Sequence, residues 1–242
     1  DVAEHGVRHL RERFPTVTYA NRVGELFARL PFAGTPLPFN DDPTADIQIV
    51  ARGWSETVLL LFCGLTHNLG LPLAVVHSWT GRLNASLIYL RDFRCHNFLE
   101  GASSRGATRA ATIAALQEII AALGAKRVVC YGSSAGVFGA LHYGLDLKAE
   151  AVLCAGGTVN LTPEFNAYTV YEQSANELEA VLPNAPLDLR RLYEAAPRPP
   201  RVRMIYGADY WDDRIHAEYL TTLPCVTLQP VENFANTMSS SN

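Results

Sequence analysis

A serine flanked by glycines lies near the middle of the chain, in Gly132-Ser133-Ser134-Ala135-Gly136. The apolar run 128–131 before it is typical of a strand, and the residues after it have apolar side chains three and four apart, as in a helix. A sharp strand-to-helix turn pushes its serine toward a base and an electrophile, which a hydroxyl needs to act as a nucleophile. Small residues two positions before and after let the strand and helix cross closely. Ser134 is therefore the candidate nucleophile.

A glycine-rich turn of this kind can also cradle a phosphate. A dinucleotide fold places that turn after its first strand and carries an acidic residue about 20 positions later. Here the turn lies beyond residue 130, and the next expected strand, 151–155, ends in Gly156-Gly157. Both observations favour the nucleophilic serine over the phosphate loop.

The pattern G-x-S-x-G between strand and helix resembles the nucleophile elbow of the α/β-hydrolases. The resemblance covers roughly residues 46 to 231. It implies an α/β fold: a three-layer sandwich with a mostly parallel sheet of about seven strands and a helical insertion, or lid, before the strand that carries the acid. It also implies an oxyanion hole made by the backbone N–H groups of Leu65, which follows the apolar strand 57–63, and of Ala135.

The resemblance implies a catalytic acid just after the second strand that follows the elbow strand. Gly207-Ala208-Asp209 ends such a strand, so Asp209 is the candidate carboxylate that orients and stabilises an imidazolium. Asp212 and Asp213 compete for this role, and we expect one of them to cap the following helix.

The catalytic base is the part of the family pattern that this sequence does not match. In the family a histidine follows the last strand, but here no histidine occurs after His216. His216 is the first candidate, His67 in the oxyanion loop is the second and His96 the third. Three explanations stay open: the chain is cut or altered near its end, the base has moved, or the domain has lost chemistry and kept a pocket. Without a base the rate falls on the order of 10²- to 10⁴-fold.

The composition limits the function classes. The 242 residues carry a net charge of −4 with scattered arginines, so we expect neither a nucleic-acid nor a membrane-surface partner. Five cysteines without paired spacing predict free thiols in a reducing, cytoplasmic setting. Since no C-x-x-C pattern and no apolar run near 20 residues occurs, we expect no metal, cofactor or membrane span.

The chain divides into a helical lead-in or linker at residues 1–30 and one α/β-hydrolase-like domain at 31–242. Strands are expected near 47–52, 57–63, 86–90, 128–131, 151–155, 202–206 and 226–231, and a helix at 107–123. The stretch 70–82 fits helix and strand equally well. Residues 157–200 contain no expected strand and form the lid insertion, and the lead-in suggests an upstream domain in a longer chain.

These residues predict a serine-dependent ester hydrolase or O-acyltransferase that forms a covalent acyl-enzyme at Ser134. The partner is then a small-molecule ester or acyl donor. If the lead-in joins a glycan-building module, an O-acyl group on a carbohydrate would be the substrate. The alternative is a catalytically impaired module of the same fold that binds a ligand or a partner protein.

Overall fold

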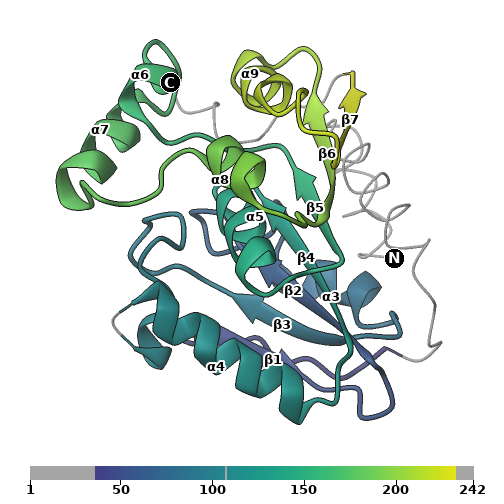
Figure 1. The fold of residues 1–242 in the computed structure, drawn as a ribbon. Helices are drawn as coiled ribbons and strands as arrows, with labels where there is room; N and C mark the ends of the chain where they lie inside the picture. Colours follow the sequence, from purple (N-terminus) through teal and green to yellow (C-terminus); the bar gives the residue numbers. More distant parts are fainter. Residues whose placement is uncertain (1–35, 107, 233–242) are drawn as a thin grey trace, which may run out of the picture.

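The computed structural model describes residues 36–106 and 108–232 (Figure 1). The predicted lead-in at 1–30 lies outside the described residues. So do residues 233–242, where the family pattern places its histidine. No helix in the described ranges is both long and apolar enough to cross a membrane.

Within the described residues, seven strands form one sheet in the order β1-β3-β2-β4-β5-β6-β7. Only β1 is antiparallel to its neighbour, and the other pairings are parallel. The mostly parallel sheet predicted from the sequence is confirmed. The strands are β1 (Ile47–Val50), β2 (Thr57–Phe62), β3 (Ser86–Leu90), β4 (Arg127–Ser133), β5 (Ala151–Ala155), β6 (Arg201–Gly207) and β7 (Val226–Val231).

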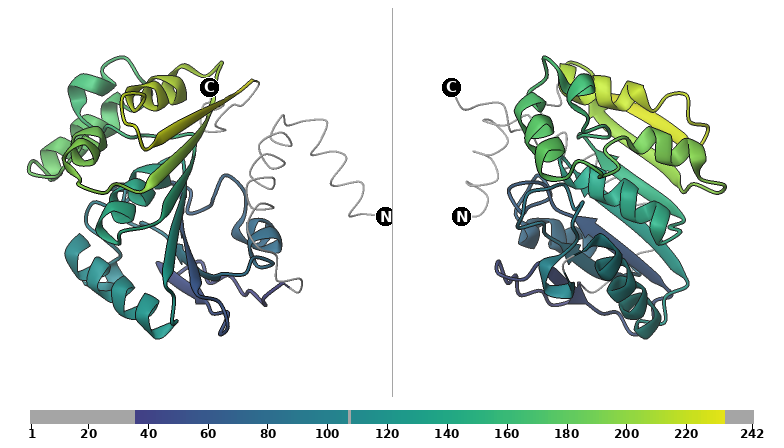
Figure 2. Two further views of the ribbon diagram at one scale, coloured as in Figure 1. Left: turned by 45° about the vertical axis from the view of Figure 1, so that its right-hand side comes forward. Right: turned by 60° about the vertical axis from the view of Figure 1, so that its left-hand side comes forward.

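Helices cover both faces of the sheet, which makes the three layers (Figure 2). Along β2, Val58, Leu60 and Phe62 pack beneath α4 and α5, while Leu59 and Leu61 face α3. This strand is therefore buried on both faces, as its continuous apolar run predicts. The helices are α3 (Leu73–Thr80), α4 (Arg109–Ala122), α5 (Gly136–Asp146), α6 (Pro163–Asn166), α7 (Glu172–Val181), α8 (Leu189–Ala195) and α9 (Trp211–Tyr219), with a 3-10 turn, η1, at Ser103–Arg105.

Two stretches of the sequence, one ambiguous and one expected to be helical, form helices with identifiable local start or stop signals. The ambiguous stretch 70–82 is α3, which begins after Pro72. The helix expected at 107–123 is α4, and the Thr108 side chain caps it by accepting the Ala111 N–H at 3.2 Å. Gly124, which follows α4, has φ 66°, the left-handed conformation that ends a helix.

The insertion between β5 and β6 holds α6, α7 and α8 (Figure 1). The segment before α6 and the segment before α8 meet in an isolated antiparallel bridge between Asn160 and Asp188. The last helix, α8, packs on α5, where the Tyr193 hydroxyl donates to the Leu141 carbonyl at 3.1 Å. Within the predicted insertion, α8 therefore belongs to the layer over the sheet, and α6 and α7 form the part that projects from it.

The described cysteines are all free thiols. Cys63, Cys130 and Cys154 are buried in or beside strands, where they act as small apolar side chains.

Candidate active site

The strand-to-helix turn predicted around Ser134 is present. β4 ends at Ser133 and α5 begins at Gly136, so only Ser134 and Ala135 make the reversal. Ser134 has φ 55°, a left-handed conformation that costs energy for a residue with a side chain and that is often found at functional sites. Its N–H donates to the Gly156 carbonyl at 2.7 Å, which fixes the turn to the end of β5. Ser134 is partly exposed, whereas Ser133 is buried.

The two glycines of the motif are required by close backbone approach. A Cβ atom on Gly132 would lie 2.3 Å from the Gly136 carbonyl oxygen. A Cβ atom on Gly136 would lie 2.1 Å from the Phe62 carbonyl oxygen, at the end of β2. Both distances are far below van der Waals contact, so neither position accepts a side chain without movement of the backbone. The spacing of the motif therefore reflects the crossing of β4 with α5 and the end of β2.

The loop after β2 lies against the turn that carries Ser134, which we call the candidate nucleophile turn. The Gly64 N–H donates to the Asn68 carbonyl at 2.8 Å and the His67 N–H donates to the Gly64 carbonyl at 2.9 Å, so the loop closes on itself. In the described part of the chain, neither the Leu65 N–H nor the Ala135 N–H donates a hydrogen bond. The two amides assigned to an oxyanion hole are therefore available, and the N-terminal dipole of α5 adds positive potential at Ala135.

The aspartates after β6 have different environments. Asp209 is exposed in the turn, and Asp212 and Asp213 are buried in the first turn of α9. An Asp212 oxygen accepts the Val170 N–H at 3.1 Å, which joins α9 to the loop between α6 and α7. The expectation that one of these aspartates caps α9 is wrong, because Tyr210 is the N-cap residue and no side chain caps the helix.

His216, the first candidate base, lies in α9 with no exposed surface. Its Nδ1 accepts the Val159 N–H at 3.3 Å, and the rings of Phe165 and Tyr171 pack beside it at centroid distances of 5.0 and 5.4 Å. Burial lowers the pKa of His216 to about 3. A general base works best with a pKa near the operating pH, so this environment favours a structural role for His216.

The other two candidate histidines lie in loops at the carboxyl ends of β2 and β3. His67 is partly exposed in the Gly64–Asn68 loop, and its ring contacts Phe93 edge to face at 4.9 Å between centroids. The Nδ1 of His96 pairs with a Glu100 oxygen at 2.5 Å, one helical turn away in sequence. Of these three histidines, His67 is the one that lies in the loop contacting the Ser134 turn.

No protein-family model matches this sequence, and no curated protein sequence matches it. Solved structures do match its fold. A hormone-sensitive lipase from a metagenome library superposes with a TM-score of 0.55 at 16% identity, over 96% of this chain and 88% of that chain. The Staphylococcus aureus fluorophosphonate-binding serine hydrolase FphF superposes with a TM-score of 0.52 at 15% identity, over 84% and 81%. The protein has the α/β-hydrolase fold.

A third match comes from a complex. The glycosylation-associated Gap123 complex of Streptococcus agalactiae contains a chain with a TM-score of 0.52 and 14% identity, over 83% of this chain and 43% of that one. All three identities are low, so the likeness concerns the fold.

The α/β-hydrolase fold places the Ser134 turn, the Leu65 loop and the Asp209 turn at the same edge of the sheet, because β2, β4 and β6 run parallel.

At the end of β3, Arg91 pairs with Asp41, from the segment before β1. Asp92 accepts the N–H groups of Arg94 at 3.0 Å and Phe98 at 2.8 Å. Asp41 lies in a loop rich in aspartate and proline, so no local pattern in the sequence marked it as the partner.

Proposed function

We propose that this protein is a serine-dependent ester hydrolase or O-acyltransferase that forms a covalent acyl-enzyme at Ser134. The left-handed φ of 55° at a partly exposed serine between β4 and α5 carries the proposal. A strained residue with a side chain, held by the Gly156 carbonyl, is the arrangement in which an α/β-hydrolase presents its nucleophile. The matched structures named as a lipase and a serine hydrolase support the ester-cleaving half of the proposal.

In the proposed reaction the Ser134 oxygen attacks the ester carbonyl carbon and its proton passes to a base. The Leu65 and Ala135 N–H groups donate to the oxyanion, whose collapse breaks the acyl–oxygen bond and releases the alcohol with the proton from the base. Water or a second alcohol then takes the acyl group from Ser134. The reaction is a hydrolysis when water accepts the acyl group and an acyl transfer when an alcohol accepts it.

We assign proton transfer to His67, because its loop contacts the nucleophile turn and its side chain is partly exposed. His216 fits the role poorly, since its Nδ1 accepts a backbone N–H and burial lowers its pKa to about 3. Asp209 remains the candidate carboxylate, because it is exposed at the same edge of the sheet. Its negative charge would stabilise a cation that forms there during the reaction.

Hydrolysis of p-nitrophenyl acetate by the purified chain tests the proposal. Ser134→Ala should lower kcat/KM by at least about 100-fold, and the matched Ser133→Ala variant should keep most of the activity. His67→Asn should lower the rate more than His216→Asn. Equal rates for wild type and Ser134→Ala would reject Ser134 as the nucleophile.

The second candidate function is a ligand-binding module with the same fold but impaired chemistry. It is favoured by one observation: residues 217–242 contain no histidine, so residues 232–242, which follow β7, do not include the family's base. A well-folded wild type that hydrolyses p-nitrophenyl acetate no faster than Ser134→Ala would support this candidate.

For the enzyme, the likeness to a chain of a glycosylation-associated complex supports carbohydrate-linked acyl groups as the substrate class. An O-acetylated methyl glycoside is the corresponding probe.

A further inference from the structure

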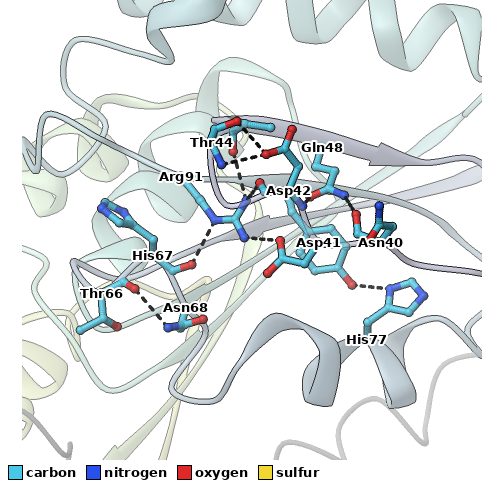
Figure 3. A network of polar contacts seen from close by, with 12 residues as sticks. Asn40, Asp41, Asp42, Thr44, Gln48, Thr66, His67, Asn68, His77 and Arg91 are labelled. Carbon is cyan, nitrogen blue, oxygen red and sulfur yellow. Dashed lines mark hydrogen bonds and ion pairs between the residues drawn. The ribbon is translucent and has the colours of Figure 1, made fainter.

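Arg91 is a buried arginine at the carboxyl end of β3, with only 3% of its surface exposed. Its guanidinium joins two separate segments (Figure 3). On one side Nη1 donates to the carbonyls of Asp42 at 2.9 Å and Ala45 at 3.1 Å, and Nη2 pairs with the Asp41 carboxylate. On the other side Nε donates to the His67 carbonyl at 3.2 Å.

The His67 carbonyl belongs to the loop that contacts Ser134. His67 has φ 59°, a left-handed conformation that a non-glycine residue adopts only when its surroundings hold it there. Two backbone hydrogen bonds close the loop from within, but they do not fix its position relative to the sheet. At the His67 end of the loop the bond from Arg91 Nε does so, because Arg91 follows β3 directly and β3 pairs with β2 on the side away from β4.

The charge on Arg91 is compensated where it is buried. Asp41 supplies the opposite charge, and three backbone carbonyls accept the remaining directed hydrogen bonds. A buried ion pair adds little net stability once desolvation is counted, so we attribute to this pair the geometry that it imposes on the segments it joins. The planar guanidinium bonds in several fixed directions at once, which a lysine ammonium on its flexible stem does not reproduce.

We propose that Arg91 is a positioning residue for the oxyanion loop: its buried guanidinium fixes the Gly64–Asn68 loop against the sheet, and so holds the Leu65 N–H beside Ser134. The inference rests on the proposed function for its catalytic consequence. The loop position itself is a separate property that can be measured without any activity. Arg91 acts through Leu65 and does not touch the reacting atoms.

Arg91→Lys tests the proposal, with Arg52→Lys as its matched control. Arg52 is similarly buried, at 5% exposure, and its Nη2 donates to the Gly81 carbonyl at 2.6 Å. It follows β1, which runs antiparallel to β3, so Arg52 lies at the sheet edge opposite to Ser134. Both substitutions replace a buried guanidinium by an ammonium group. The Arg91 guanidinium binds the Gly64–Asn68 loop, whereas the Arg52 guanidinium lies at the other edge of the sheet.

Two readouts are measured on each variant at a temperature where it is fully folded. Amide hydrogen exchange of peptides covering residues 64–68 should be at least about 10-fold faster in Arg91→Lys and unchanged in Arg52→Lys. With p-nitrophenyl acetate, kcat of Arg91→Lys should fall about 10- to 100-fold with KM within about threefold of wild type, because the lost donor acts mainly on the transition state. Arg52→Lys should keep both constants.

Unchanged exchange of residues 64–68 in Arg91→Lys would overturn the proposal, as would equal losses of kcat in both variants. If wild type shows no esterase activity, the proposed function fails, and the exchange measurement still decides the positioning role. If Arg91→Lys does not fold, Asp41→Asn replaces it, because Asp41 is partly exposed and touches the same guanidinium. Faster exchange of residues 64–68 in Asp41→Asn supports the proposal, and wild-type exchange overturns it.

Discussion

Gly64 and Ser134 touch across the edge of the sheet: a Cβ atom on Gly64 would lie 3.3 Å from the Ser134 Cβ and 3.3 Å from the Ser133 carbonyl oxygen. The loop after β2 and the nucleophile turn are therefore one packed unit. A methyl group fits between them only if one side moves by a few tenths of an ångström. Such a movement would shift the Leu65 N–H relative to the Ser134 oxygen.

Gly64→Ala should lower kcat for p-nitrophenyl acetate by about 10-fold while the free energy of unfolding changes by less than about 1.5 kcal/mol. The loss arises from misplacement of the oxyanion donor rather than from unfolding. Steady-state kinetics and urea titration measure the two quantities. Gly53→Ala is the control, since a Cβ atom there meets nothing within 4 Å. Full activity in Gly64→Ala would show that the loop does not need its present position.

Gly136→Ala should destabilise the protein by at least about 2 kcal/mol, because its Cβ atom would meet the Phe62 backbone at 2.1 Å, where no flexible side chain can give way. Urea unfolding followed by circular dichroism measures the change. Gly53→Ala should stay within about 0.5 kcal/mol of wild type. A Gly136→Ala protein as stable as wild type would contradict the crossing of β2, β4 and α5 described above.

Much of the fold could be predicted from the sequence because its signals are local. The apolar runs at 57–63, 86–90 and 151–155 predict their strands within one residue, and the glycine spacing around Ser134 predicts the turn. The environments of the polar residues could not be predicted in this way. Arg91 and Asp41 are 50 residues apart, and their pairing depends on how β1 and β3 bring two loops together. The burial of His216 depends on Phe165 and Tyr171, which come from the insertion.

Alanine substitution of Asp209 should lower the activity, whereas alanine substitution of Asp212 should lower the stability. Asp209→Ala should lower kcat by about 10²- to 10⁴-fold with little change in stability, because Asp209 is exposed at the same edge of the sheet as Ser134. Asp212→Ala should cost about 1–3 kcal/mol of stability, because it removes the acceptor of the Val170 N–H. Kinetics and urea titration of both variants check this. If Asp212→Ala instead lost activity at unchanged stability, Asp212 would replace Asp209 as the acid.

The stability should fall as the pH falls below about 6.5. Burial lowers the pKa of His216 to about 3, and burial together with the Arg109 guanidinium lowers the pKa of His142 to about 3. An unfolded chain binds these protons near pH 6.5, so acid favours unfolding between pH 6.5 and 3. Each histidine contributes a slope of about 1.4 kcal/mol per pH unit in that window.

His216→Asn should remove one histidine's share of that slope, as measured by urea unfolding at about pH 6, 5 and 4. Asparagine keeps an oxygen that can accept the Val159 N–H, so the fold is expected to survive. His142→Asn should remove a similar share, and the double variant should remove both. An unchanged slope in His216→Asn would mean that the imidazole is already protonated in the folded protein, contrary to its buried site.

The most direct measurement is covalent labelling with a fluorophosphonate, followed by intact mass and peptide mapping. Wild type is expected to gain one phosphonyl group on the peptide that contains Ser134, Ser133→Ala is expected to label like wild type, and Ser134→Ala is expected not to label. A folded wild type that stays unlabelled, or a Ser134→Ala protein that labels equally well, would contradict Ser134 as an activated nucleophile.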